Sequence, residues 1–263
     1  MLPVESEDTL AGVQLTSAVD YPGKLCSTLF LGGCNFRCPF CHNGSLVLDP
    51  RGAAISFKEV LTALHWRRGL VDVVTITGGE PTLNPPRLGR LIREIKAMGY
   101  RVKLDTNGSH PEVLADCLGE LDYVALDIKN APTVYAETAG TWVDLERIAH
   151  SVALLAGRPH ELRTTVVPGL HGPKEIEDIG RWIRVIDSGI GPEAAENLAR
   201  EPLIHHPEPV ERTYVLQPFR PGPGNLAPLY RTMPAFDKVA LQALRDAAEP
   251  FFQRVILRGW AQD

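Results

Sequence analysis

The sequence CSTLFLGGCNFRCPFCHN, residues 26–43, joins an apolar run to a glycine-rich loop that carries three cysteines. Residues 26–31 are typical of a β-strand, and the two glycines after them end it. Cys34, Cys38 and Cys41 then follow with the spacing C-x3-C-x2-C. Thiolates are soft metal ligands, and close spacing on one loop allows several of them to bind one centre. The stretch therefore predicts a metal or redox site directly after a strand.

Three cysteines leave the kind of centre open. A tetrahedral zinc or a common iron–sulfur cluster takes four ligands. If these cysteines hold a four-iron cluster, one iron lacks a protein ligand and can bind a small molecule. His42 would give a structural zinc its fourth ligand, although adjacent Cys41 and His42 are awkwardly placed to bind one ion. Cys26 and Cys117 lie in apolar contexts, where core packing is the simpler interpretation.

The rest of the chain alternates β-rich and amphipathic segments. Strands are predicted at residues 26–31, 71–77, 100–105, 123–128, 162–167, 213–217 and 254–257. Helices are predicted at residues 56–68, 86–98, 111–120, 144–156, 174–187 and 237–248. Six βα units in succession predict a parallel sheet with right-handed crossovers. Because a closed barrel needs eight units, the length fits a partial barrel or an open sheet.

Two proline-rich stretches interrupt this pattern. The 263 residues are expected to form a single domain. Residues 189–211 contain four prolines and many acidic residues, and they predict a surface-loop insertion. His205 and His206 within it are interpreted as solvated loop side chains rather than metal ligands. Residues 220–234 predict a second loop that covers the end of the sixth strand.

Charge and cysteine usage exclude several classes of function. The formal net charge is −5, from 27 basic and 32 acidic residues, which argues against general nucleic-acid binding. No apolar run approaches the roughly 18 residues of a membrane-spanning helix, and the first ten residues do not resemble a signal peptide. Five cysteines, three of them clustered, favour a metal or redox site in a reducing cytoplasm over a disulfide framework. We therefore expect a cytoplasmic protein without nucleic-acid or membrane partners.

Polar residues and glycines gather at the ends of the predicted strands. In parallel α/β proteins, sites form at the carboxyl ends of the strands. Each residue alone could be part of a turn or a solvated charge, but together they suit a zwitterionic ligand. Glycine backbone can approach such a ligand closely, carboxylates can bind its ammonium, and cations its carboxylate. The candidates are Gly78, Gly79, Glu80, Asp105, Asn107, Lys129, Arg163 and Gln217.

These motifs resemble a known superfamily. The cysteine triplet with Phe40 before its last cysteine, together with GGEP at residues 78–81, resembles the radical S-adenosylmethionine (SAM) enzymes. The sequence VQLTSAVDYPGKLCSTLFLGGCNFRCPFCHN at residues 13–43 is similar to the activating proteins of glycyl radical enzymes. Among these it is most similar to the activating proteins of anaerobic ribonucleoside-triphosphate reductases. The resemblance implies an α/β fold with a partial (β/α)6 TIM-like barrel.

The resemblance also implies cofactors and chemistry. Cys34, Cys38 and Cys41 would bind a [4Fe-4S] cluster, whose open iron is chelated by the amino and carboxylate groups of SAM. Reduction by a donor such as flavodoxin or ferredoxin cleaves SAM to methionine and a 5′-deoxyadenosyl radical. That radical removes a hydrogen atom from a glycine of a partner enzyme. A partial barrel leaves a lateral opening through which a partner's peptide loop could enter.

Roles for the candidate residues follow from the same resemblance. Residues 78–80 would meet the methionine amino end, while Asp105 and Asn107 line the ligand site. Lys129 would lie near the methionine or ribose, and Phe40 beside the adenine. Arg163 and Gln217 are included as further SAM contacts. Related pyruvate formate-lyase activating enzymes commonly have a histidine where this chain has Gln217 and Phe219, so that contact departs from the pattern.

The expected function is activation of an anaerobic (class III) ribonucleoside-triphosphate reductase. Activation of another glycyl radical enzyme, of the pyruvate formate-lyase type, is the nearest alternative. A small-molecule enzyme of the 7-carboxy-7-deazaguanine synthase type is a second, although VDYPG at residues 19–23 points away from it. A zinc-stabilised binding module is the alternative from a different class.

Overall fold

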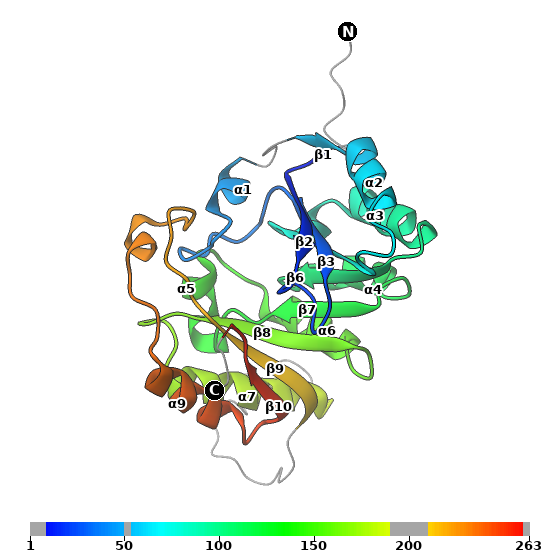
Figure 1. The fold of residues 1–263 in the computed structure, drawn as a ribbon. Coiled ribbons are helices and arrows are strands. Elements are labelled where there is room, and N and C mark those ends of the chain that lie inside the picture. Colours follow the sequence, from blue (N-terminus) through cyan, green and yellow to red (C-terminus); the bar gives the residue numbers. More distant parts are fainter. Residues whose placement is uncertain (1–8, 50–53, 190–209, 260–263) are drawn as a thin grey trace. The chain divides into compact units, whose positions relative to one another are not determined.

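The computed structural model describes residues 9–49, 54–189 and 210–259 (Figure 1). Its contacts divide the chain into two compact units. The first contains residues 1–35, 43–106 and 112–125, and the second contains residues 36–42, 107–111 and 126–263. Residues 190–209, most of the predicted insertion, lie outside the described residues, and so do His205 and His206.

The first unit is built on parallel strands that are flanked by an antiparallel strand. β3 (Cys26–Leu31), β5 (Val73–Gly78) and β6 (Arg101–Thr106) pair in parallel, and β2 (Gly12–Ser17) pairs antiparallel with β3. A two-stranded ribbon joins β1 (Thr9–Leu10) to β4 (Ile55–Ser56). The helices are α1 (Gly44–Leu48), α2 (Phe57–His65), α3 (Pro85–Ala97) and α4 (Pro111–Cys117), with a 3-10 turn, η2, at Pro81–Leu83.

The second unit repeats the parallel arrangement. β8 (His160–Val166), β9 (Val210–Pro218) and β10 (Phe252–Leu257) pair in parallel, in the order β8-β9-β10. β7 (Tyr123–Asp127) belongs to both units, with its last two residues in the second. The helices are α5 (Tyr135–Ala139), α6 (Leu145–Leu154), α7 (Pro173–Asp187) and α9 (Lys238–Ala248), with 3-10 turns η3 (Pro132–Val134) and η4 (Pro228–Arg231).

Local sequence signals explain where the helices begin. Ser56 caps α2: its side chain accepts a hydrogen bond from the Glu59 N–H, and the Ser56 N–H donates to the Glu59 carboxylate, so the two residues form a capping box. Asp144 and Asp237 cap α6 and α9 in the same way. Each of these side chains satisfies a backbone N–H that has no partner within its helix.

The predicted elements are all present, with shifted ends. α2 ends at His65 rather than at residue 68, and β9 begins at Val210 rather than at residue 213. The structure adds β2, whose residues are mostly half-exposed or exposed. An edge strand of this kind lacks the apolar run of a buried parallel strand, which is why the sequence pattern did not identify it.

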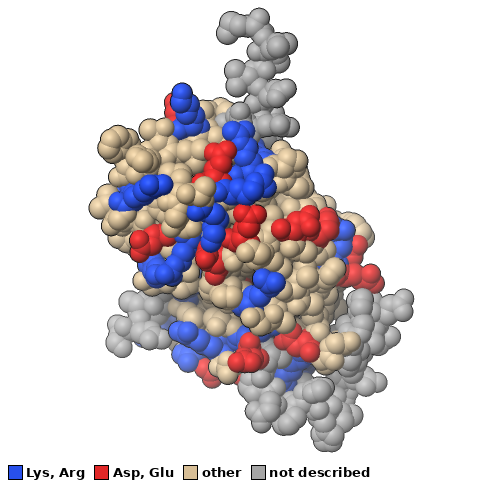
Figure 2. Space-filling view, turned by 90° about the vertical axis from the view of Figure 1, so that its right-hand side faces the viewer, with Lys and Arg blue, Asp and Glu red and all other residues tan. Residues whose placement is uncertain are grey.

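Two surface properties bear on possible partners. No helix among the described residues combines the length and apolarity needed to cross a lipid bilayer. On the face shown in Figure 2, basic and acidic side chains are interspersed over the described residues.

Two helical glycines provide a matched test of packing. A Cβ added to Gly180 of α7 would lie 2.7 Å from Phe251 Cβ, whereas one added to Gly89 of α3 would meet the flexible end of Arg93 at 3.2 Å. We expect Gly180→Ala to lower the free energy of unfolding by about 1–3 kcal/mol through overpacking. Gly89→Ala should raise it by up to about 1 kcal/mol through helix propensity. Urea denaturation measures both, and equal effects would contradict the packing at Gly180.

Candidate functional site

The last two cysteines of the loop are joined by a tight turn in the second unit. The Cys41 N–H donates to the Cys38 carbonyl at 3.0 Å, so residues 38–41 form a β-turn with Pro39 at its second position, where proline is favoured. Cys38 is buried and Cys41 is half-buried. The sequence C-P-F-C thus fixes two thiols at the two ends of one turn.

The end of α5 supports the beginning of the same loop. The Arg37 N–H donates to the Ala139 carbonyl at 2.8 Å. A Cβ added to Gly140 would lie 2.7 Å from the Arg37 carbonyl carbon. Only glycine permits this backbone approach, and no local sequence pattern indicates it because Arg37 and Gly140 are far apart in the chain.

In the first unit, backbone hydrogen bonds join the residues at the end of β3 to those that follow β5. The Gly79 N–H donates to the Leu31 carbonyl and the Glu80 N–H to the Gly33 carbonyl, both at 2.8 Å. A Cβ on Gly78 would lie 2.5 Å from Leu31 N, and one on Gly79 would lie 2.5 Å from the Gly33 carbonyl carbon. These glycines are therefore needed for contact between two loops, and half-buried Cys34 directly follows that contact.

Glu80 is a buried carboxylate held by threonines. It is only 2% exposed. Its Oε1 accepts hydrogen bonds from Thr82 N at 3.1 Å, Thr82 Oγ1 at 2.6 Å and Thr106 Oγ1 at 2.7 Å. Thr82 and Thr106 were not among the residues that the sequence analysis singled out. They fix the orientation of the Glu80 carboxylate, which was one of the candidates.

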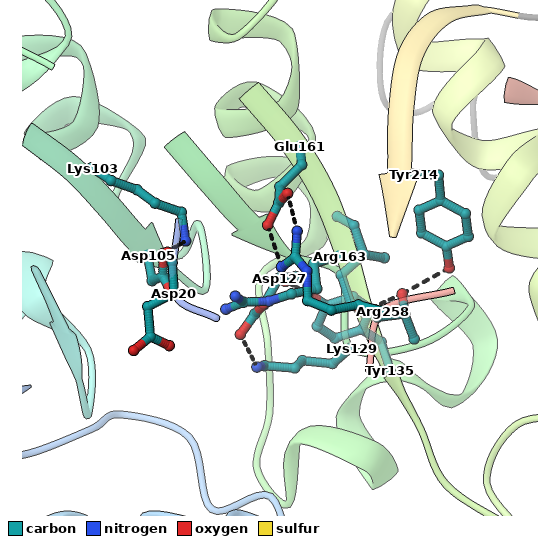
Figure 3. Close-up of polar contacts among 12 residues, drawn as sticks. Asp20, Lys103, Asp105, Asp127, Lys129, Tyr135, Glu161, Arg163, Tyr214 and Arg258 are labelled. Atoms are coloured by element: carbon teal, nitrogen blue, oxygen red, sulfur yellow. Dashed lines mark hydrogen bonds and ion pairs between the residues drawn. The ribbon is translucent and has the colours of Figure 1, made fainter. Parts of the chain in front are cut away.

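Asp105 forms a buried ion pair that the sequence did not predict. The Lys103 ammonium lies 2.6 Å from Asp105 Oδ1 and donates to the Asp20 carbonyl at 2.8 Å (Figure 3). Thr28 donates to the Asp20 carboxylate at 2.8 Å, and it shares a register across β3, β5 and β6 with Thr75 and Lys103. The alternation of strand residues places these polar side chains on one face of the sheet.

Lys129, which follows β7, and Arg163 of β8 meet on one carboxylate. Arg163 Nε lies 2.6 Å from Asp127 Oδ1 and Lys129 Nζ lies 2.9 Å from Oδ2 (Figure 3). Burial favours neutral Asp127, but the guanidinium and the ammonium outweigh it and hold the pKa of Asp127 well below its usual range. Two cations on one carboxylate leave a net positive charge in this cluster.

The surroundings of Lys129 connect this cluster to the cysteine loop. Burial opposes charging of Lys129, but Asp127 and a Cys38 thiolate raise its pKa above the usual range. Burial also raises the pKa of Tyr135, whose hydroxyl donates to the Asp127 carbonyl at 3.5 Å. Lys129 and Cys38 are therefore within electrostatic reach of each other inside the second unit.

His171 holds the backbone beneath Lys129. Its Nδ1 accepts from the Val167 N–H at 3.1 Å, so Nε2 carries the proton and donates to the Lys129 carbonyl at 2.8 Å. Burial lowers the pKa of His171, which keeps the ring neutral. A histidine that follows a predicted strand gives no sequence signal for this role.

The remaining candidates also lie in the second unit. Phe40 is buried, and its ring contacts Tyr230 edge-on at 6.2 Å between centroids. Asn107 Oδ1 accepts from the Ser109 N–H at 2.9 Å and its hydroxyl at 2.6 Å, a turn-forming arrangement. Gln217 is half-buried on β9 opposite Thr165.

The donor set fits an iron–sulfur cluster. None of the five cysteines forms a disulfide, and the loop offers three soft ligands and no further cysteine. Within residues 9–49, 54–189 and 210–259, no group of three or more His, Cys, Asp and Glu side chains surrounds the position of a single metal ion.

Comparison with known proteins identifies relatives along most of the chain. The family model of the radical SAM superfamily matches residues 28–183, more than half of the sequence. A glycyl-radical enzyme activating enzyme of Methanocaldococcus jannaschii, whose name is itself provisional, is 33% identical over 186 residues, 68% of this chain and 76% of that protein.

Two further relatives correspond to the two alternatives from the sequence. A pyruvate formate-lyase-activating enzyme of Staphylococcus epidermidis is 26% identical over 201 residues, 68% of this chain and 76% of that protein. A 7-carboxy-7-deazaguanine synthase of Hyperthermus butylicus is 33% identical over 119 residues, but these are only 44% of this chain and 50% of that enzyme.

Solved structures confirm the predicted fold class. A mutant of spore photoproduct lyase superposes with a TM-score of 0.55 at 13% identity, covering 94% of this chain and 80% of that one. The structure of Streptococcus suis SuiB bound to the precursor peptide SuiA also superposes with a TM-score of 0.55. The identity is 15%, and the superposition covers 88% of this chain and 48% of that one. Identities this low show a shared fold, the partial TIM-like barrel of the α/β class, and not a shared activity.

Lys103 provides a test of the buried ion pair. The Lys103 and Asp105 side chains are 1% and 10% exposed, whereas Lys96 and Asp122, paired at 2.8 Å in the same unit, are 34% and 31% exposed. We expect Lys103→Met to lower the free energy of unfolding by about 3–5 kcal/mol, because it leaves a buried carboxylate without its counter-ion. Lys96→Met should cost about 1 kcal/mol or less. Equal losses on urea denaturation would show that the Lys103 pair is effectively solvated.

His171 should make stability pH-dependent. Since its pKa is lowered on folding, the unfolded chain binds the extra proton first, and stability is lost as the pH falls through about 6.5. We expect His171→Gln to flatten the decline in the free energy of unfolding between about pH 7.5 and 5.5. A native slope in His171→Gln would show that this ring does not titrate as described.

Proposed function

Since this chain belongs to the radical SAM superfamily, among the relatives of glycyl-radical enzyme activating enzymes, we propose that it activates an anaerobic (class III) ribonucleoside-triphosphate reductase. The match to the superfamily extends from β3 into α7. The provisional activating enzyme of M. jannaschii is related over 68% of the chain. The proposal treats residues 1–263 as one radical SAM domain.

The cysteine loop supplies the cofactor site. Cys34, Cys38 and Cys41 bind the [4Fe-4S] cluster and leave one iron open for SAM, since the loop offers three thiols and no fourth cysteine. When bound, the cluster supplies the electron that cleaves the carbon–sulfur bond of SAM. The turn at residues 38–41 holds two of the ligands at a fixed spacing, which reduces the conformational entropy lost on binding.

The flanking residues bind the two ends of the methionine moiety. Gly78, Gly79 and Glu80 receive its ammonium, because buried Glu80 is an acceptor whose direction two threonines fix. The net positive cluster of Lys129, Arg163 and Asp127 attracts its carboxylate.

The other candidates contact the rest of SAM. Asp105 and Asn107 are proposed as further residues of the ligand site. Phe40 is proposed to lie beside the adenine, and Gln217 is proposed as a further SAM contact. The buried position of Phe40 gives the adenine an apolar surface with which to exclude water from the reacting carbon.

The proposed partner rests on the resemblance of residues 13–43 to reductase-activating proteins. The stretch that resembles reductase-activating proteins, residues 13–43, is anchored at Asp20 by Lys103 and Thr28. Its sequence signature therefore corresponds to a structured element beside Asp105. The same proposal includes flavodoxin or ferredoxin as reductant, and the cytoplasm as the compartment that keeps the thiols reduced.

The cysteine assignment is tested first. Anaerobically purified protein should be brown with about four irons per chain, and it should cleave SAM reductively without a partner. Cys34→Ala, Cys38→Ala and Cys41→Ala should each abolish cleavage. Cys117→Ala is the control, because that buried thiol lies at the end of α4 and its loss should leave iron content and cleavage unchanged. Cleavage retained in any of the three would refute the ligand set.

The partner is tested separately. The reduced holoenzyme is mixed with SAM and either an anaerobic ribonucleoside-triphosphate reductase or a pyruvate formate-lyase, and the glycyl radical is counted by electron paramagnetic resonance. We expect a radical on the reductase only. A radical on the lyase alone, or turnover of a 7-deazaguanine precursor without a protein substrate, would replace the proposed partner and leave the superfamily assignment intact.

A further inference from the structure

A short segment near the C-terminus binds the backbone of the cysteine loop. The N–H groups of Leu226 and Ala227 donate to the carbonyls of Cys41 at 3.1 Å and of Pro39 at 2.8 Å. Between them, the Asn225 side-chain amide donates to the Phe40 carbonyl at 2.8 Å. Three consecutive carbonyls of the loop are thus bound by three consecutive residues that follow them by 185 positions or more. Residues 224–227 are called the loop-binding segment below.

Asn225 is a buried loop residue that forms hydrogen bonds through both its backbone and its side chain. It is 1% exposed, its own N–H donates to the Gly222 carbonyl at 3.1 Å, and its carbonyl accepts from Arg231 Nε at 3.2 Å. Its Oδ1 is buried and has no hydrogen-bond partner among the described residues. An unpaired buried acceptor is unfavourable for folding, and such groups call for another explanation. The bond from Asn225 Nδ2 to Phe40 supplies one.

Gly224 brings the segment against the next residue of the loop. A Cβ added there would lie 2.7 Å from the His42 carbonyl oxygen, closer than real Cβ contacts. Gly222, two residues earlier, has its nearest neighbour at 3.9 Å and can accept a methyl group. The contact at Gly224 is with backbone, which cannot rotate away as a side chain can.

We propose that residues 224–227 are a positioning element of the cysteine loop, which holds the Cys38 and Cys41 thiols in the geometry that binds the cluster. A peptide group is planar, so fixing the carbonyls of residues 39–41 orients the three peptide planes that lead to Cys41 and out of it. The loop is then ordered before the cluster arrives. This inference rests on the proposed assignment of Cys38 and Cys41 as cluster ligands.

The same region also supports the Phe40 side chain. Tyr230, three residues after the segment, contacts the Phe40 ring at 6.2 Å and the Phe219 ring at 5.9 Å between centroids. The backbone and the ring of Phe40 are therefore held by neighbouring parts of one loop. Loosening the segment should weaken the binding of SAM as well as of the cluster, because Phe40 is proposed to lie beside the adenine.

The test compares variants of the anaerobic holoenzyme. Asn225→Ala removes the bond to the Phe40 carbonyl, and Gly224→Ala pushes against the His42 carbonyl. Gly222→Ala is the matched control in the same loop. A second pair, Ala227→Pro and Ala227→Ser, removes or keeps the N–H that binds Pro39. Because φ at Ala227 is −92° and proline prefers about −65°, the proline variant needs a local backbone adjustment, and its melting temperature is compared with that of Ala227→Ser.

Iron release to a chelator and amide hydrogen exchange of residues 40–42 are the readouts, together with the melting temperature as a check on folding. We expect Asn225→Ala, Gly224→Ala and Ala227→Pro to release iron about 10–100-fold faster, as loss of outer support does at other metal sites. The rate of amide hydrogen exchange at residues 40–42 should rise in the same three variants. Gly222→Ala and Ala227→Ser should match the native protein.

Native iron release in the three test variants, or equal acceleration in the two controls, would overturn the positioning role. A native chain that binds no iron–sulfur cluster would overturn it together with the proposed function. A cluster retained equally by native and variant protein would overturn the positioning role alone. Variants that fail to melt cooperatively are replaced by the Ala227 pair, which changes one backbone donor and no packed side chain.

Discussion

The backbone contact between the chain after β3 and the chain after β5 is the constraint on which the candidate site depends. Gly79 and Glu80 donate to the Leu31 and Gly33 carbonyls, and the space between the two chains admits no Cβ. Because the cysteine loop leaves β3 at this contact, its starting direction is set by two hydrogen bonds rather than by side-chain packing. A substitution there would move the first cysteine and the GGE backbone together.

The polar interior of each unit follows a second constraint, since a buried charge must be paired. In the first unit Lys103 neutralises Asp105 and also holds the Asp20 loop. In the second unit Asp127 is shared by Lys129 and Arg163. Removing one partner of such a pair leaves a buried charge without compensation, which is strongly destabilising.

The superfamily of this chain and its proposed partner are supported by different observations. The superfamily and its cofactors follow from a match that covers more than half of the chain and from a donor set of three thiols. The proposed partner rests on the resemblance of residues 13–43 to reductase-activating proteins. The loop-binding segment adds a feature that the motif does not contain, because residues 224–227 lie far from the cysteines in sequence.

Local sequence patterns were enough to predict the βα alternation, the cysteine triplet and the polar strand ends, because each depends on neighbours a few residues apart. The fold class and most helix and strand positions could be predicted for that reason. Only the folded chain shows that Lys103 also reaches the Asp20 carbonyl, that Arg163 binds Asp127, and that Asn225 binds Phe40. These contacts join strands and loops whose pairing and register are set by packing over long chain separations, and no local pattern records which carbonyl or carboxylate a distant donor will reach.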